Sequence, residues 1–91
     1  MVTVQEIKLA LRMSSAVLDQ EVQGTIAAAV LDLQGGGMPV GVDTALSDEA
    51  IRLYCKWRYD YMGKAAQYER SYDRLKTVLA LLPKEEVGSN G

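Results

Sequence analysis

Apolar residues recur every three or four positions through most of this chain, which is the period of an amphipathic α-helix. This period predicts an all-α fold, a small bundle of four helices with short connections. The loop between the second and third predicted helices, Met38–Ala45, is compatible with an extended piece at Met38–Val42. The expected bounds of the helices are Val4–Met13, Ala16–Gln34, Asp48–Met62 and Ala65–Leu82.

The predicted helix ends carry residues that cap helices. Thr3 and Glu6 have the spacing of a capping box, in which each side chain bonds the other residue's backbone N–H. Ser47 is the expected N-cap of the third helix. Lys8 and Arg12 are expected on the solvated side of the first helix, opposite its apolar face. Side chains near the helix ends thus fix where the helices begin.

The second helix has two apolar faces. The first predicts a core stripe: Leu18, Val22, Ile26, Ala29, Val30 and Leu33. The second carries Val17, Gly24, Ala27, Ala28 and Leu31. A helix with two apolar faces is central in the fold or touches a neighbouring subunit. Gly24 lowers helix propensity by about 1 kcal/mol relative to alanine. It is either a tolerated solvent-facing glycine or a point of close approach by another helix.

The third and fourth helices hold the only tryptophan, all five tyrosines and the only cysteine. A stripe on the fourth helix predicts antiparallel packing on the third after a turn at Gly63. The third helix has a wider apolar arc, which includes Trp57. The aromatic residues are therefore interpreted as core packing rather than as a base-stacking platform. The stripe consists of Tyr68, Tyr72, Leu75, Leu79 and Leu82.

Four side chains of the third predicted helix are candidates for a partner interface. Arg58 falls within the apolar arc, where its stem can lie on the core with the guanidinium in solvent, or it can form an ion pair across a subunit boundary. Tyr59 is expected on the polar face, and tyrosine is enriched at interfaces. Arg52 and Lys56 form a basic strip one turn apart, which a solvated face also explains. With Gly24, Ala27 and Leu31 on the second helix, they complete the candidate interface.

Composition gives no support for catalysis. The chain has no histidine, a single cysteine and carboxylates scattered over helix surfaces. No spacing matches a calcium loop or a zinc site. Cys55 without a histidine partner is interpreted as a small buried hydrophobic residue. We therefore expect a protein that is not an enzyme and that has no cofactor and no metal.

The remaining features concern organisation and location. Gly35-Gly36-Gly37 lacks the Lys-Ser/Thr ending of a phosphate-binding loop and is interpreted as a helix stop. We expect one domain over residues 1–83 and a flexible polar tail over residues 84–91. No signal-peptide core or apolar membrane span is evident. The net charge of −2 argues against broad attraction to nucleic acid. A soluble intracellular protein is the expectation.

From Ser47 onward the chain resembles the small helical head–tail connector proteins of tailed bacteriophages. These are also called head-completion, adaptor or DNA-packaging proteins. The resemblance lies in AIRLYCKWRYDYMG, a spacer, and YERSYDRLKTVLAL. TVQEIKLALRM and the helix at Val17 to Leu33 are similar to the first half of such proteins.

The resemblance implies a structural virion protein at the head–tail interface, present in the host cytoplasm during assembly. About a dozen subunits would form a ring beneath the portal protein and extend the DNA channel. The ring would then accept a stopper or tail-completion protein, and DNA would pass without sequence-specific binding. The alternative is a small helical DNA-binding or regulatory protein, although the third helix lacks a dense basic recognition face.

Overall fold

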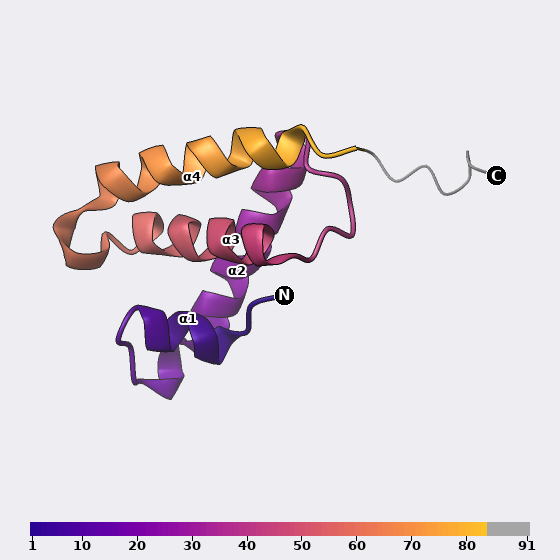
Figure 1. The fold of residues 1–91 in the computed structure, drawn as a ribbon. Helices are drawn as coiled ribbons and strands as arrows, with labels where there is room; N and C mark the ends of the chain where they lie inside the picture. The colour runs from indigo at the N-terminus through magenta and orange to yellow at the C-terminus, as the bar shows by residue number, and fades with distance from the viewer. Residues whose placement is uncertain (84–91) are drawn as a thin grey trace.

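The structure, a computed structural model, describes residues 1–83. Four α-helices, two short 3₁₀ turns and no strand occur among these residues, which confirms the predicted all-α fold (Figure 1). The tail at residues 84–91 lies outside the described residues. The helices are α1 Val4–Ala10, α2 Asp19–Gly35, α3 Ala45–Arg58 and α4 Ala65–Ala80, with 3₁₀ turns at Ala16–Leu18 and Tyr61–Gly63.

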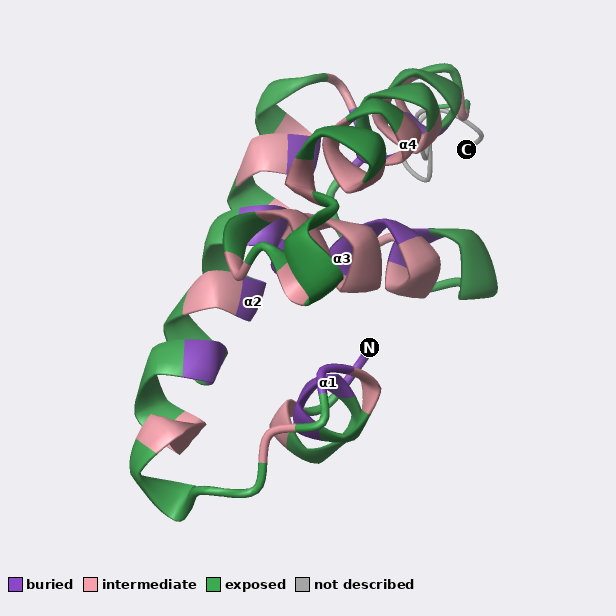
Figure 2. Cartoon of the chain, turned by 90° about the vertical axis from the view of Figure 1, so that its left-hand side faces the viewer, coloured by how far each residue is buried: buried purple, intermediate pink, exposed green. Residues whose placement is uncertain are grey.

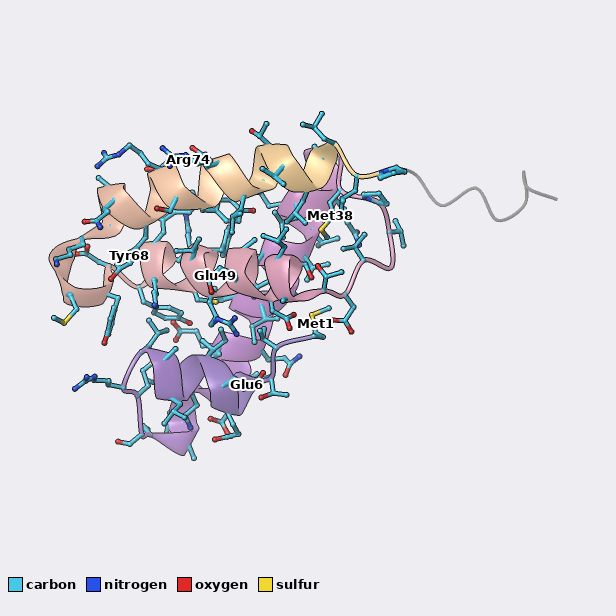
Figure 3. All side chains as sticks on the ribbon, in the orientation of Figure 1. Met1, Glu6, Met38, Glu49, Tyr68 and Arg74 are labelled. Atoms are coloured by element: carbon cyan, nitrogen blue, oxygen red, sulfur yellow. The ribbon has the colours of Figure 1, made fainter. Side chains whose placement is uncertain are left out.

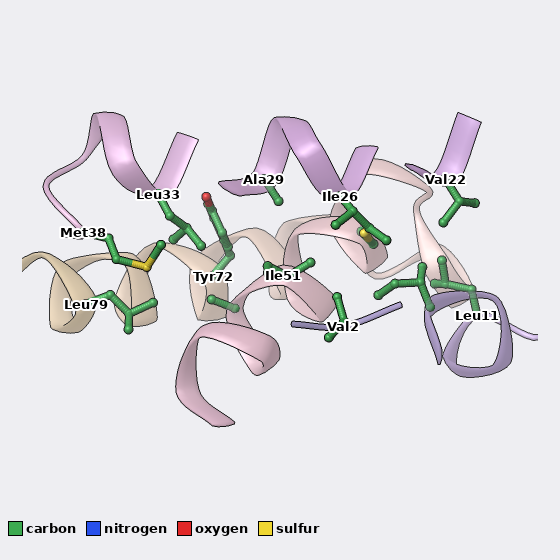
Figure 4. Packing of buried hydrophobic residues seen from close by; sticks show 13 residues of the cluster. Val2, Leu11, Val22, Ile26, Ala29, Leu33, Met38, Ile51, Tyr72 and Leu79 are labelled. Carbon is green, nitrogen blue, oxygen red and sulfur yellow. The ribbon is translucent and has the colours of Figure 1, made fainter. Parts of the chain in front are cut away.

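Helices α3 and α4 form an antiparallel hairpin, as the fourth-helix stripe predicts. The long helix α2 crosses behind α3, and α1 packs against the first half of α2 (Figure 1). One core joins these layers, because each helix contributes its apolar stripe to a shared cluster (Figure 4). The fully buried members include Val22, Ala29, Leu33, Ile51, Tyr72 and Leu79.

The ends of α1 show how local chemistry sets a helix length. The Thr3 hydroxyl accepts from Glu6 N at 3.1 Å and the Glu6 carboxylate accepts from Thr3 N at 2.8 Å, so the capping box is confirmed. The helix stops at Ala10 rather than at Met13, because Arg12 adopts a left-handed conformation with φ 58°. Met13 N then donates to Lys8 O at 2.8 Å, which closes a Schellman motif.

The side chain of Lys8 corrects the predicted solvated face of α1. Lys8 is only 6% exposed, and its Nζ lies 2.5 Å from Asp19 Oδ1 at the start of α2. Its charge is therefore paired across two helices, which sequence periodicity along one helix does not reveal. The contact ties α1 to the beginning of α2.

Helix α2 ends at the glycine run as predicted. Gly37 has φ 120°, and Met38 N donates to Leu33 O at 3.0 Å, the longer bond of a Schellman motif. Met38 and Leu33 are both buried, which supplies the apolar contact that accompanies this motif. The extended piece considered at Met38–Val42 is not formed, because no strand occurs within residues 1–83.

Helix α3 differs from the prediction at both ends. It begins three residues earlier than expected because Thr44, not Ser47, is the N-cap, and Ser47 completes the capping box with it. It ends at Arg58 rather than at Met62, because Asp60 and Met62 adopt left-handed conformations with φ 50° and 57°. The turn into α4 is therefore longer and more tightly bent than a hinge at Gly63 alone.

Candidate interaction surface

The predicted second apolar face of α2 is exposed to solvent in the monomer. We define the α2 outer face as its exposed residues: Gln20, Glu21, Gln23, Gly24, Ala27, Ala28, Leu31 and Gly35. Figure 2 shows this side of α2 in green along its length, with the buried positions turned toward α1 and α3. Three candidate interface residues, Gly24, Ala27 and Leu31, lie together there.

The two faces of α2 differ sharply although their residues alternate in sequence. Leu33 is 0% exposed and Leu31, two positions earlier, is 68% exposed. A Cβ added at Gly24 would have no atom from another element of residues 1–83 within 4 Å. Close approach by another helix of the same molecule is therefore excluded at Gly24, and this glycine faces open space.

A groove runs beside the α2 outer face. Its volume is about 410 Å³, and we call it the α2 groove. Met1 and Val2 belong to its lining, and the Met1 amino group bonds Asp43 and lies 3.7 Å from Asp48 Oδ1. The groove is therefore apolar inside and has acidic residues beside it. Its lining consists of Met1, Val2, Gln23, Ile26, Ala27, Val30 and Leu31.

Arg52 and Lys56 do not join the α2 outer face. Arg52 Nε lies 3.2 Å from Glu49 Oε1, and Figure 3 shows Glu49 in front of α3 while α2 passes behind it. Lys56 Nζ lies 5.6 Å from the ring centre of Tyr68 and 5.8 Å from that of Tyr61, within cation–π range. Both side chains are half-buried, and intrachain contacts account for their position.

Arg58 is exposed at the last turn of α3. Its guanidinium carbon lies 5.5 Å from the Trp57 ring centre and 6.0 Å from that of Tyr54. This is the first of its two interpretations, a stem and a guanidinium that cover the core while reaching solvent. The cross-subunit ion pair stays a prediction. Trp57 beneath it is half-buried and packs against Tyr72 rather than being fully enclosed.

The expected place of Tyr59 on a solvated polar face is wrong. Tyr59 is half-buried, packs against the core, and its hydroxyl lies 3.0 Å from Thr25 Oγ1 on α2. Burial raises the pKa of Tyr59, which agrees with this position. The reason is that α3 stops at Arg58 and Tyr59 is its C-cap, where helical periodicity no longer sets the direction of the side chain. Tyr59 therefore joins α2 to α3 within one molecule.

A polar cluster that sequence reasoning missed joins α2 to α4. The Tyr72 hydroxyl donates to Asp32 Oδ2 at 2.6 Å, and Lys76 Nζ donates to the same oxygen at 3.0 Å. The hydrogen bond from Tyr72 lowers the pKa of Asp32, and burial raises the pKa of Tyr72 well above its ordinary range. These residues are 40 and 44 positions apart, so only the folded chain brings them together.

The lone thiol gives a pH-dependent prediction. Burial raises the pKa of Cys55 to about 12, so the native state keeps a proton that the unfolded chain loses above the ordinary thiol value of about 8.5. Stability is therefore fully present below that value and is lost as pH rises toward the native pKa. Each pH unit in this window should remove about 1.4 kcal/mol through this one group.

Urea unfolding of the wild type and Cys55→Ala between about pH 8 and pH 10 measures this contribution. Tyrosine side chains begin to ionise only near the top of that range. The Met1 amino group, whose pKa is raised by its bond to Asp43, affects both proteins alike. The wild type should lose stability more steeply than the variant. Parallel curves would contradict the burial of the Cys55 thiol.

The described part of the chain offers no site for metal chemistry. No group of three or more histidine, cysteine or acidic side chains within residues 1–83 is arranged to hold a metal ion. In the same range, no helix has the length and apolar character needed to cross a membrane. The distinctive surface is thus the α2 outer face with its groove.

Comparison of the chain with protein-family models, with curated proteins and with solved structures found no match.

Proposed function

We propose that this chain is a head–tail connector subunit of a tailed bacteriophage. Copies of it form a ring beneath the portal protein, extend the DNA channel and receive a stopper or tail-completion protein. The proposal draws on the resemblance in the segments from Ser47 onward and on the surface of α2. The subunit acts by assembly, with no chemical step.

The observation that carries the proposal is the scarcity of charge on the α2 outer face. Of the exposed residues of α2, a helix described in full, only Glu21 is charged. The exposed residues of α4 include Arg70, Asp73 and Arg74, as is usual for a solvated helix. Depletion of charge marks the centre of protein interfaces. A face that carries a single charge and exposes Leu31 therefore suits contact with another subunit.

Binding to the portal protein tests the function directly. Native mass spectrometry of the purified chain mixed with the portal protein of the same phage should show many copies bound per portal ring. The chain alone should be monomeric or weakly associated, since its assembly depends on the portal. No binding under any salt condition would contradict the proposal. Duplex DNA binding that weakens steeply with salt would favour the DNA-binding alternative instead.

The variant Gly24→Glu separates folding from assembly. Glutamate has a higher helix propensity than glycine, and the Cβ that it adds has open space, so the free energy of unfolding should rise by about 0.5 kcal/mol. The added charge on the α2 outer face should prevent ring formation on the portal. Thermal melting and native mass spectrometry measure the two effects.

The matched control is Gln67→Glu, which adds the same charge to an exposed position of α4. It should leave ring formation unchanged. If Gly24→Glu assembles as well as the control does, the α2 outer face is not a subunit contact.

A further inference from the structure

The turn between α3 and α4 presents an exposed apolar side chain at a bent backbone. We define the hairpin tip as Arg58–Lys64. Met62 there is 70% exposed and has φ 57°, a left-handed conformation that costs a non-glycine residue on the order of 1 kcal/mol. Figure 1 shows the tip at the end of the hairpin that projects beyond α2. Strained conformations of non-glycine residues cluster at functional sites, which makes this tip a candidate for one.

The hairpin tip is also basic. Arg58 and Lys64 are exposed at its two ends, and Lys56 lies two positions before Arg58, over the rings of Tyr61 and Tyr68. Asp60 is the acidic residue of the tip, and its Oδ1 accepts from Ala65 N at 3.1 Å to cap α4. An apolar methionine side chain is therefore surrounded by a net positive charge.

The α2 groove has the complementary character. Ile26, Val30 and Leu31 line it, and the acidic residues Asp43 and Asp48 lie next to Met1 at its edge. Two carboxylates therefore lie close to one amino charge at this edge. The groove volume of about 410 Å³ is ample for a methionine side chain, which is unbranched and adapts to irregular apolar sites.

The two features lie on different ends of the molecule. Asp43 and Asp48 are at the start of α3 and the hairpin tip is at its end, so about 15–20 Å of helix separates them. The hairpin tip therefore cannot reach the α2 groove of the same molecule. Contacts between two basic tips, or between two acidic grooves, would repel. Attraction therefore requires the tip of one copy and the groove of another.

We propose that the hairpin tip of one subunit, with Met62 leading, occupies the α2 groove of the next subunit. The proposal rests on the ring assembly proposed above and assigns its contact. Such a head-to-tail contact joins different surfaces of the two copies, so each copy keeps one free tip and one free groove. Contacts of this type generate closed rings when the rotation closes.

Disulfide trapping tests the pairing. Met62→Cys and Leu31→Cys are purified separately and mixed at low ionic strength. The mixture is oxidised both without portal protein and bound to it. A cross-link between position 62 of one copy and position 31 of another is expected, and neither variant should form a cross-link without the other variant. The control replaces Leu31→Cys by Leu9→Cys on α1, which is 81% exposed but does not line the groove, and should not cross-link.

Charge at the tip gives a second readout. Lys64→Glu reverses one charge and places an acid at the start of α4, where the helix dipole favours it. Cross-linking should fall several-fold while the melting temperature is kept. Added salt should lower the cross-linking of the original pair, because exposed charges are screened.

The outcomes separate this contact from the function. Rings on the portal without the 62–31 cross-link, or a Leu31→Cys homodimer, would overturn the head-to-tail contact and leave the connector function standing. A 62–31 cross-link without portal binding would support the contact and overturn the function. Failure of both would overturn both.

Discussion

Tyr72→Ala is expected to lower the free energy of unfolding by about 3–5 kcal/mol. Tyr72 is 1% exposed and packs edge-on against Tyr54 with ring centres 5.3 Å apart. Its removal leaves a cavity between α3 and α4 and frees Asp32 of its shortest hydrogen bond. Small domains have a total stability of only about 5–15 kcal/mol, so this loss removes a large part of the free energy of unfolding. Urea unfolding followed by circular dichroism measures the loss.

Tyr72→Phe is the matched control because it keeps the ring and removes only the hydroxyl. It should cost about 1.5–3 kcal/mol, the usual range for a hydrogen bond to a charged group. Lys76 still pairs with Asp32 in this variant. Equal losses in the two variants would mean that the hydroxyl, and not the packed ring, gives Tyr72 its role.

Leu33→Ala is expected to destabilise the protein by about 2–5 kcal/mol, whereas Leu31→Ala should change stability by less than about 0.5 kcal/mol. The two positions share one helix and one substitution, so helix propensity changes equally in both. They differ in burial, because Leu33 packs in the core against Met38 and Leu31 faces solvent. In an assembly measurement we expect the order of the two effects to reverse, because Leu31→Ala should weaken the ring more than Leu33→Ala does.

Thermal and urea unfolding of the isolated chains measure the first effect, and native mass spectrometry on the portal measures the second. Similar losses of stability for the two variants would mean that the outer face of α2 is covered within the monomer. That result would remove the basis for a subunit contact there.

Much of the fold was predictable because its signals are local. The Thr3–Glu6 capping box, the stop at the glycine run and the antiparallel hairpin all follow from residues close in sequence. The two faces of α2 were also predictable, since a helix of fixed period with two apolar stripes has to show one of them to solvent unless it is enclosed.

The structure differs from the sequence-based prediction where tertiary contacts or turn geometry determine the position of a side chain. Lys8 is buried by Asp19 of the next helix, and Tyr59 turns inward to Thr25 because α3 has already ended. The Asp32–Tyr72 contact spans 40 positions and leaves no trace in the local pattern. Ser47 and Thr44 are both residues that can cap a helix N-terminus, and the structure places the N-cap of α3 at Thr44, one turn before Ser47.

The structure of the ring bound to its portal, determined by electron cryo-microscopy, tests the central claim most directly. We expect Gly24, Ala27 and Leu31 of each subunit to be covered by the neighbouring subunit. A ring in which these three residues face solvent would contradict the claim that the α2 outer face is a subunit contact.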